Sequence, residues 1–304
     1  MAEATIQADG DTQVTRAAYA KINLYLDVIS CREDGFHELL TVMHSISLHD
    51  DVTVRISSGE ARDIRLHVSG ARLPLDSKNL AYRAADAFLA QAGLSAGVQI
   101  YIRKNLPIAA GRAGGSSDAA AVLLALNELA GYPLGQDELL SLGATLGSDV
   151  PFCMVGGTQI CRGRGEEMRP LACGAPLYIV LANGRERVST PRAFAAMDEY
   201  YHRFDGSVPH GGRPERLYRA MAGGRLHTSA DAVYNAFEPV VLPTCPAATA
   251  LRAQLLSLGA YAACMSGSGP SVFGLFHTLS QARRAAAAIG PHARVATSAP
   301  ASLS

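Results

Sequence analysis

The sequence lacks an excess of either charge, because 27 Lys and Arg residues balance 27 Asp and Glu residues. A nucleic-acid-binding protein usually carries a basic stripe, and the most basic local run, Arg162 to Arg164, is too short to form one. The chain also lacks an apolar run of about eighteen residues, the length that crosses a membrane. We therefore expect neither a nucleic-acid partner nor a membrane partner.

Cysteine is scarce, and its spacing carries no metal or redox motif. The six cysteines form no Cys-x-x-Cys pair and no zinc spacing with the nine histidines. This pattern predicts buried free thiols in a reducing, cytoplasmic environment. Residues 1–16 lack the basic start and the apolar block of a signal peptide, and we interpret them as a disordered tail.

The rest of the composition is that of a globular protein with a sizeable core. The chain has 304 residues, of which 48% are hydrophobic and 18% are charged. This length exceeds that of a usual single core, so two lobes are expected. A Gly- and Arg-rich turn followed by Pro170 marks the predicted boundary, which gives an N-terminal lobe over residues 17–169 and a C-terminal lobe over 170–304.

Hydrophobic periodicity predicts an α+β fold. In the first half the predicted strands are 18–28, 36–48, 52–56, 63–68 and 98–102, and the predicted helices are 79–92, 136–146 and the segment that ends near Gly131. In the second half the predicted order is strand 177–181, helices 190–201 and 246–258, strands 261–265 and 272–276, helix 279–289 and strand 293–297. That order is typical of a split βαβ, ferredoxin-like unit with an extra helix. Residues 205–225, rich in Gly, Pro, His and Arg, are interpreted as an exposed loop.

The feature with the clearest chemical meaning is a glycine-rich loop, PIAAGRAGGSSDAA, from Pro107 to Ala120. Glycines let the backbone approach a ligand closely, and the N–H groups and positive dipole end of the following helix favour phosphate. Ser116 and Ser117 add hydroxyls that can cap the helix, bond phosphate oxygens or ligate a divalent cation. A plain helix-capping turn explains the same residues, so the loop alone does not decide its role.

The loop fits neither of two familiar phosphate motifs. A Walker loop requires a lysine before the serine, and no lysine stands before Ser116. A dinucleotide fingerprint requires Gly-x-Gly-x-x-Gly, which Gly111, Gly114 and Gly115 do not match. A phosphate-binding role therefore needs support from elsewhere in the chain.

Two turns in the sequence offer that support, each with a plainer explanation. The segment Ser266 to Pro270 joins two apolar strands and can present N–H groups to an anion, although a hairpin loop explains it as well. Asp149 stands just before Val150 and Pro151. It either caps a helix there or is held as a base toward a hydroxyl group.

A strand near the start of the chain carries a polar face made of Lys21, Asn23, Tyr25 and Asp27. Solvent exposure of one side of a sheet explains such alternation. The alternative is a fixed positive charge at Lys21 beside a transferring phosphoryl group. Phosphoryl transfer needs a phosphate cradle, a cation and a group that positions the attacking hydroxyl, and the chain offers a candidate for each.

Taken together, AYAKINLYLDV, PIAAGRAGGSSDAA and MSGSGPSVFGLF resemble, in this order, the three motifs of the GHMP kinases, a family named for galacto-, homoserine, mevalonate and phosphomevalonate kinases. REDGFHELLTVMHSISLHD and LGSDVPF extend the resemblance to a branch that phosphorylates a cytidine diphosphate compound in the non-mevalonate isoprenoid pathway. The close matches cover residues 18–50, 104–130, 146–157 and 264–276. The resemblance implies a two-lobed GHMP kinase fold with an N-terminal ribosomal-protein-S5-like lobe, a C-terminal ferredoxin-like lobe, and the active site between them.

The resemblance also implies a catalytic pair. Asp149 would be the base that activates the substrate hydroxyl, and Lys21 beside it would keep it ionised and stabilise developing charge. ATP and Mg²⁺ are the implied cofactors, and a small cytidine diphosphate compound is the implied substrate. Ser117 is a possible ligand of the cation.

The remaining implied site residues fall into two groups. The ATP-binding group comprises Asn79, Lys104, Pro107, Ile108, Ala109, Ala110, Gly111, Arg112, Ala113, Gly114, Gly115, Ser116 and Ser117. The substrate-binding group comprises Asn23 near the acceptor, Phe36 and His37 around cytosine, Phe194 as a second aromatic wall, and Ser266, Gly267, Ser268 and Gly269. Phe36 stands where tyrosine is common in the family, and Arg112 is either a solvent-facing charge or an added phosphate contact.

Two other functions remain open on the sequence. A homoserine or mevalonate kinase would share the motifs, but the DGFHE segment and Phe194 would have no use there. A silent nucleotide-binding module would share the fold, but it would not need both Lys21 and Asp149.

Overall fold

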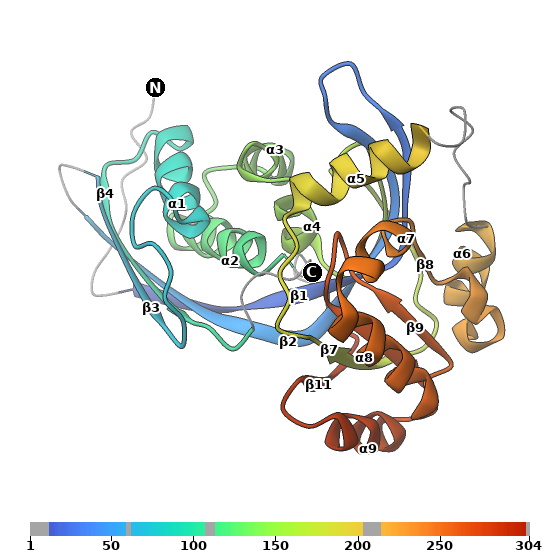
Figure 1. The fold of residues 1–304 in the computed structure, drawn as a ribbon. Helices are drawn as coiled ribbons and strands as arrows, with labels where there is room; N and C mark the ends of the chain where they lie inside the picture. Colours follow the sequence, from blue (N-terminus) through green and yellow to red (C-terminus); the bar gives the residue numbers. More distant parts are fainter. Residues whose placement is uncertain (1–11, 59–61, 107–112, 203–213, 302–304) are drawn as a thin grey trace.

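The structure is a computed structural model that describes residues 12–58, 62–106, 113–202 and 214–301. In these residues the strands form two sheets, which belong mainly to the two halves of the molecule (Figure 1). The first part of the glycine-rich loop, from Pro107 to Arg112, lies outside the described residues, so the predictions made for it stay predictions.

The first sheet is built on a long antiparallel hairpin of two strands. Its strands are β1 (Thr12–Cys31), β2 (His37–Ser58), β3 (Asp63–Ser69), β4 (Ala96–Arg103), β5 (Thr158–Arg162), β6 (Glu167–Pro170) and β8 (Tyr234–Asn235). The order is β3-β4-β2-β1-β8, with β5 paired to a different stretch of β2 and β6 paired to β5. Because β8 lies beyond the predicted boundary at residue 170, the second half of the chain contributes a strand to this sheet.

The hairpin extends further than the sequence predicts. Residues 12–16 pair with residues 52–56 of β2, so the prediction of a disordered tail is wrong for them. The two strands predicted over 36–48 and 52–56 are a single strand. Pairing with the long strand β2 places residues 12–16 in the sheet, although their own sequence is polar and only weakly favours a strand.

Four helices of the first half pack near one another over this sheet (Figure 1). They are α1 (Leu80–Gln91), α2 (Gly114–Leu129), α3 (Gln136–Leu146) and α4 (Val150–Val155). α2 contacts α1, α4 and both strands of the hairpin. A helix covered on all sides is apolar all round, which explains why the α2 residues from Ala119 to Leu126 are all buried.

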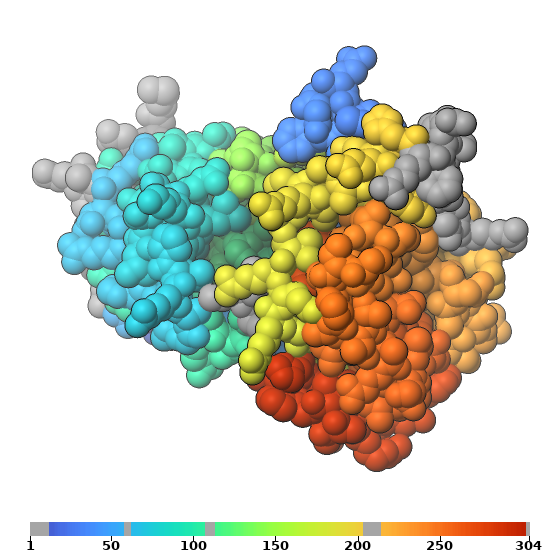
Figure 2. All heavy atoms as spheres, in the orientation of Figure 1, coloured from blue at the N-terminus to red at the C-terminus, as the bar shows by residue number. Residues whose placement is uncertain are grey.

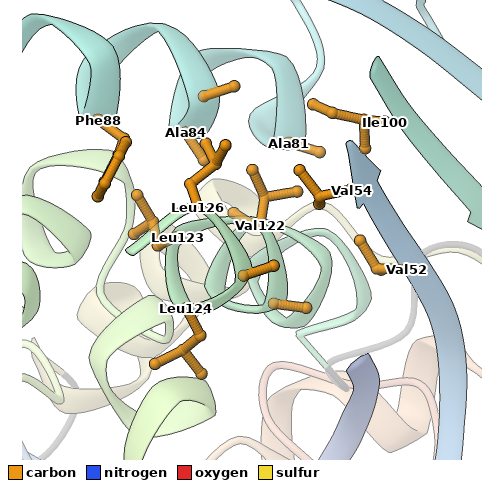
Figure 3. Packing of buried hydrophobic residues seen from close by; sticks show 14 of the residues in the cluster. Val52, Val54, Ala81, Ala84, Phe88, Ile100, Val122, Leu123, Leu124 and Leu126 are labelled. Atoms are coloured by element: carbon orange, nitrogen blue, oxygen red, sulfur yellow. The ribbon is translucent and has the colours of Figure 1, made fainter. Parts of the chain in front are cut away.

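The core of the first half lies between the sheet and the helices α1 and α2. Figure 3 shows Val54 and Ile100 of the strands facing Ala81 of α1 and Val122 of α2. Phe88 of α1 is fully buried in the same cluster. Each large apolar side chain of this cluster contributes roughly 1.5–3 kcal/mol by leaving water, so this packing holds α1 and α2 against the sheet.

The second sheet confirms the predicted ferredoxin-like unit. Its strands are β7 (Tyr178–Ala182), β9 (Ala262–Met265), β10 (Val272–Phe276) and β11 (Ala293–Thr297). The spatial order is β11-β7-β10-β9, and the three pairings between neighbours are antiparallel. With a helical region between β7 and β9 and a helix between β10 and β11, this is a split βαβ arrangement.

The three helices predicted in the second half begin and end close to the predicted positions. The helical segments are α5 (Thr190–His202), α6 (Pro214–Ala222), η1 (Leu226–Ala232), α7 (Glu238–Val241), η2 (Leu242–Thr244), α8 (Pro246–Ser257) and α9 (Leu279–Ile289). The sequence does not predict four of these segments, α6, η1, α7 and η2. The interpretation of 205–225 as a loop is wrong over α6. Leu217 and Met221 of α6 are buried, so packing of one apolar face stabilises a helix despite the flanking glycines and prolines.

The cysteines only partly follow their prediction. Each is a free thiol in the described residues, but Cys31 and Cys173 are exposed, whereas Cys161, Cys245 and Cys264 are buried. Burial raises the pKa of the Cys161 thiol to about 12, so this sulfur stays protonated and unreactive at neutral pH.

A buried histidine ties the two halves of the chain together. His44 of β2 is 2% exposed. One ring nitrogen lies 2.8 Å from Thr158 Oγ1, and the other lies 2.9 Å from Ser298 Oγ near the end of the chain. Burial lowers the pKa of His44 to about 4, so the folded protein holds it neutral.

This histidine predicts a loss of stability in acid. Between pH 6.5 and about 4, the unfolded chain binds a proton at His44 and the folded chain does not, so stability falls as the pH falls. The shift corresponds to roughly 3 kcal/mol over that range. We expect His44→Gln to flatten the dependence of the unfolding free energy on pH, measured by urea titration. His67→Gln, at an exposed histidine, should leave it unchanged, and an unaltered slope in His44→Gln would contradict the account.

Candidate active site

A cavity of about 610 Å³ is lined by residues of both halves of the chain. Figure 2 shows the first half in blue to green and the second half mainly in orange and red, with the yellow α5 across their junction. The implied site residues that line the cavity are Lys21, Asn23, Phe36, His37, Ser116, Asp149, Phe194, Gly267 and Ser268. Among the described residues, those that do not line it are Asn79, Lys104, Ala113, Gly114, Gly115, Ser117, Ser266 and Gly269.

An ion pair lines the cavity. Lys21 Nζ of β1 lies 3.6 Å from Asp149 Oδ2, and the side chain of Lys21 is 5% exposed whereas that of Asp149 is 34% exposed. Asp149 immediately precedes α4, but in the described part of the chain its side chain makes no capping hydrogen bond. The helix-cap interpretation is therefore wrong, and the carboxylate is left facing the cavity and Lys21.

Lys21 is held by a short chain of hydrogen bonds. Its Nζ donates to Asn23 Oδ1 at 2.9 Å, and Asn23 Nδ2 donates to Thr41 Oγ1 at 2.8 Å. Thr41 Oγ1 in turn donates to the backbone oxygen of Tyr25 at 2.6 Å. This chain fixes the orientation of the amide and hence the position of the ammonium group. Sequence reasoning missed Thr41, because a single threonine in a strand carries no signal.

The polar face of β1 is not exposed to solvent. Lys21, Asn23, Tyr25 and Asp27 are all buried, because the second half of the chain covers them: the backbone N–H of Asn23 donates to Ser266 Oγ at 3.3 Å. The solvent-facing interpretation is wrong. Burial and the Asp27 carboxylate raise the pKa of Tyr25 far above its usual value, which keeps its hydroxyl a donor to Asp27.

A group of aromatic side chains lines the same cavity. The rings of His37 and Phe194 stack with centroids 4.6 Å apart, and Phe237 meets Phe194 edge-on at 4.9 Å. His37 Nε2 lies 2.7 Å from Asp198 Oδ1 of α5. Phe36 is 51% exposed. Sequence reasoning missed Phe237 and Asp198, which only the fold brings beside these rings.

The described part of the glycine-rich loop turns directly into α2. Ala113 adopts a left-handed conformation with φ 57° and precedes the helix, and the N–H of Ser117 donates to its oxygen at 2.7 Å. Ser116 lines the cavity. Ser117 is buried and its Oγ donates to the oxygen of Gly114 at 3.1 Å. Neither serine caps the helix, since the cap position in the described residues is Ala113.

Lys104 and Asn79 are bound into the fold and do not face the cavity. Lys104 Nζ donates to Asp50 and, at 2.7 Å, to Asp118 Oδ2. Burial raises the pKa of Asp118 to about 7 even though Lys104 lowers it. Asn79 caps α1 by accepting from the N–H of Ala81 at 3.0 Å. The implied contact of both residues with adenosine is not supported by these positions.

The turn between β9 and β10 is a hairpin loop, as predicted, and it also borders the cavity. Met265 pairs with Val272 across it, and Gly267 and Ser268 line the cavity. Asn235 Nδ2 donates to the oxygen of Gly267 at 2.9 Å. This asparagine, which sequence reasoning missed, fixes the turn from the strand β8 of the other sheet.

The chain matches two family models. Residues 79–157 match the model described as the GHMP kinases N terminal domain, and residues 212–293 match the one described as GHMP kinases C terminal. The chain belongs to the GHMP kinase family. Its two sheets and the cavity between them are therefore those of a GHMP kinase.

Curated relatives place this GHMP kinase in one branch of the family. It is 44% identical over 259 residues to a 4-diphosphocytidyl-2-C-methyl-D-erythritol kinase of Gloeobacter violaceus. These residues cover 85% of this chain and 84% of that relative. It is 42% identical over 274 residues to the enzyme of the same name from Pelotomaculum thermopropionicum, over 90% of this chain and 93% of that relative. The chain belongs to this branch and is a kinase.

Solved structures agree with this assignment. A crystal structure of 4-(cytidine 5'-diphospho)-2C-methyl-D-erythritol kinase matches with a TM-score of 0.78 and 36% identity. The match covers 94% of this chain and 100% of that chain. A homoserine kinase from Cytophaga hutchinsonii matches with a TM-score of 0.72 at 20% identity, over 98% of each chain. The second match shows the shared GHMP kinase fold alone.

As a member of a kinase family, this GHMP kinase takes the transferred phosphoryl group from ATP. Within the described residues, no helix is both long enough and apolar enough to cross a membrane. The same residues contain no group of three His, Cys, Asp or Glu side chains that could hold a metal ion.

Proposed function

We propose that this kinase transfers the γ-phosphoryl group of ATP to the 2-hydroxyl of 4-diphosphocytidyl-2-C-methyl-D-erythritol, in isoprenoid precursor biosynthesis by the non-mevalonate pathway. The observation that carries the proposal is a single cavity lined both by the Lys21–Asp149 pair and by stacked aromatic rings. A substrate with a reactive hydroxyl at one end and a cytosine at the other requires both groups.

Asp149 acts as the base in this proposal. Its carboxylate accepts the proton of the 2-hydroxyl while the hydroxyl oxygen forms a bond to the γ-phosphorus and the bond from that phosphorus to the bridging oxygen breaks, which releases ADP. Lys21, 3.6 Å from the carboxylate, favours its ionised form and offers positive charge to the oxygens of the transferring group.

In this proposal, the aromatic side chains of the cavity bind cytosine. Phe36 and Phe194 both line the cavity and offer ring faces on which a base can stack. His37 supplies a ring nitrogen to the hydrogen-bonding edge of the base. The turn at Gly267 and Ser268 offers backbone groups to the polyol in the same cavity.

In this proposal, the glycine-rich loop binds ATP. The positive end of α2, a helix of 16 residues, lies next to the cavity through Ser116, where backbone N–H groups and the dipole favour phosphate. Mg²⁺ fits here as a cation held mainly by ATP phosphates and water. Ser116 is the loop hydroxyl at the cavity, so it replaces Ser117 as the proposed protein ligand, and the cation would neutralise phosphate charge.

The test of the proposed function is ATP consumption with a panel of acceptors. We expect steady ADP release with 4-diphosphocytidyl-2-C-methyl-D-erythritol and only background release with homoserine or mevalonate. ADP release with one of the other two acceptors would support a different kinase of the family. Background rates with all three would support a silent nucleotide-binding protein.

Replacing Phe36 tests whether its ring binds the cytosine base. We expect Phe36→Ala to raise KM for the cytidine substrate by about 5- to 150-fold, because stacking of a base on an aromatic ring contributes roughly 1–3 kcal/mol. KM for ATP and the melting temperature should stay close to wild type, since the ring is half exposed. Tyr132→Ala, at an exposed ring outside the cavity, is the matched control. Equal KM values in both variants would contradict a role of Phe36 in binding the base.

A further inference from the structure

Arg164 contacts both the aromatic group and the neighbour of the proposed base in the cavity. It lies in the turn that joins β5 to β6 and lines the cavity. Its guanidinium carbon lies 4.3 Å from the centre of the Phe36 ring. On the other side, Nη2 donates to Ser148 Oγ at 3.5 Å, and Ser148 directly precedes Asp149. The side chain therefore contacts both the Phe36 ring and Ser148, the residue beside the proposed base.

The protein balances the charge of Arg164 only in part. The pKa of the Asp34 carboxyl is lowered mainly by its hydrogen bond from the N–H of Phe36 and also by the charge of Arg164, so one carboxylate lies near the guanidinium. A guanidinium carries five N–H donors, yet across the described residues Arg164 forms no ion pair and its one hydrogen bond is the long contact with Ser148. Its Nε is buried and has no partner in that part of the chain. A half-buried cation with so few acceptors has lost more hydration than these contacts return. An anion in the cavity would supply the missing acceptors.

Lys21, the lysine that lines the same cavity, already has partners within the protein. It lies 3.6 Å from the Asp149 carboxylate and donates to Asn23 at 2.9 Å. A second anionic group in the substrate therefore needs a different cation. Arg164 is suited to it, because a planar guanidinium can donate two parallel hydrogen bonds to one phosphate.

We propose that Arg164 binds the diphosphate of the cytidine diphosphate substrate, an inference that rests on the proposed function. The diphosphate joins the cytidine to the polyol. With the base against Phe36 and the reactive hydroxyl beside Asp149, the diphosphate lies between these two groups, and Arg164 contacts both Phe36 and the neighbour of Asp149. Arg164 is then a substrate-binding residue that distinguishes a phosphorylated cytidine from the free nucleoside.

The test compares the binding of cytidine 5'-diphosphate and of cytidine by calorimetry. The wild-type chain should bind the diphosphate more tightly than the nucleoside. Arg164→Met should weaken diphosphate binding by about 10- to 100-fold, as expected for the loss of charge-assisted hydrogen bonds, and should leave cytidine binding within about threefold. Arg162→Met, an exposed arginine at the end of β5, is the matched control and should retain both affinities.

The outcomes separate this proposal from the proposed function. Unchanged diphosphate binding in Arg164→Met overturns the proposal and leaves the proposed function standing. An equal loss for both ligands also overturns it, since Arg164 would then act only by supporting Phe36. A wild-type chain that binds neither ligand overturns the proposed function and this proposal together. Retained cytidine binding in the variant shows in the same experiment that the fold of the site is intact.

Discussion

Replacing Asp149 with asparagine is expected to lower kcat by about 10²- to 10⁴-fold, the range that general base catalysis contributes. Asparagine keeps the size of the side chain but cannot accept the proton of the attacking hydroxyl. Dissociation constants for ATP and the cytidine substrate should change by less than about threefold, because Lys21 remains held by Asn23 and the cavity keeps its shape. Steady-state turnover and calorimetric binding measure the two quantities separately.

The control for this prediction is Asp86→Asn, which neutralises an exposed aspartate of α1 and should leave turnover unchanged. The melting temperature of Asp149→Asn should fall only slightly: the buried Lys21 loses this ion pair, but the carboxylate is 34% exposed and makes no capping bond with α4 in the part of the chain that the structure describes. Near wild-type turnover in Asp149→Asn would show that another group, or no base at all, removes the proton.

Replacing Lys104 with methionine is expected to destabilise the fold by roughly 3–5 kcal/mol, the cost of removing one partner of a buried ion pair. Lys104 is 5% exposed and bridges Asp50, which is 0% exposed, to Asp118 of α2. Without the ammonium, the two buried carboxyl groups lose their shared counter-charge, and Asp50 keeps only its hydrogen bonds from the N–H groups of Asn105 and Leu106. Urea unfolding measures the loss, and Lys78→Met, at an exposed lysine, is the control.

The same replacement should also weaken ATP binding, because the lysine joins both sides of the glycine-rich loop. Asp50 accepts from the N–H of Leu106 at 2.8 Å, just before the loop, and Lys104 reaches the oxygen of Gly114 just after it. The double variant Lys104→Met with Asp118→Asn should recover part of the lost stability, since one buried charge is removed. A single variant as stable as wild type would contradict the account of this buried cluster.

The parts of the site that depend on local chain chemistry could be predicted from the sequence. The entry of the glycine-rich loop into α2 and the hairpin turn before Pro270 are features of short segments, and glycine and serine mark them directly. The ferredoxin-like order of the second half followed from periodicity alone, because β10, α9 and β11 are short and strongly patterned.

The parts that depend on distant contacts could not. An alternating strand looks the same whether its polar face meets water or a second lobe, and Lys21 is buried because β8 and the turn at Ser266 come from more than 200 positions away. A single arginine such as Arg164, or a lone Thr41, acquires meaning only from its neighbours in space. For the same reason the burial of Lys104 between two aspartates had no local signal.

The most direct test of the central claim is phosphorus NMR of the product formed from ATP and 4-diphosphocytidyl-2-C-methyl-D-erythritol. The 2-carbon of the polyol carries a methyl group and no hydrogen, so a phosphate on the 2-hydroxyl has no three-bond coupling to a proton. We predict one new monoester resonance that is a singlet without proton decoupling, and its appearance should require Asp149. A doublet or triplet, which places the phosphate on another hydroxyl, or the absence of any new resonance, would contradict the claim.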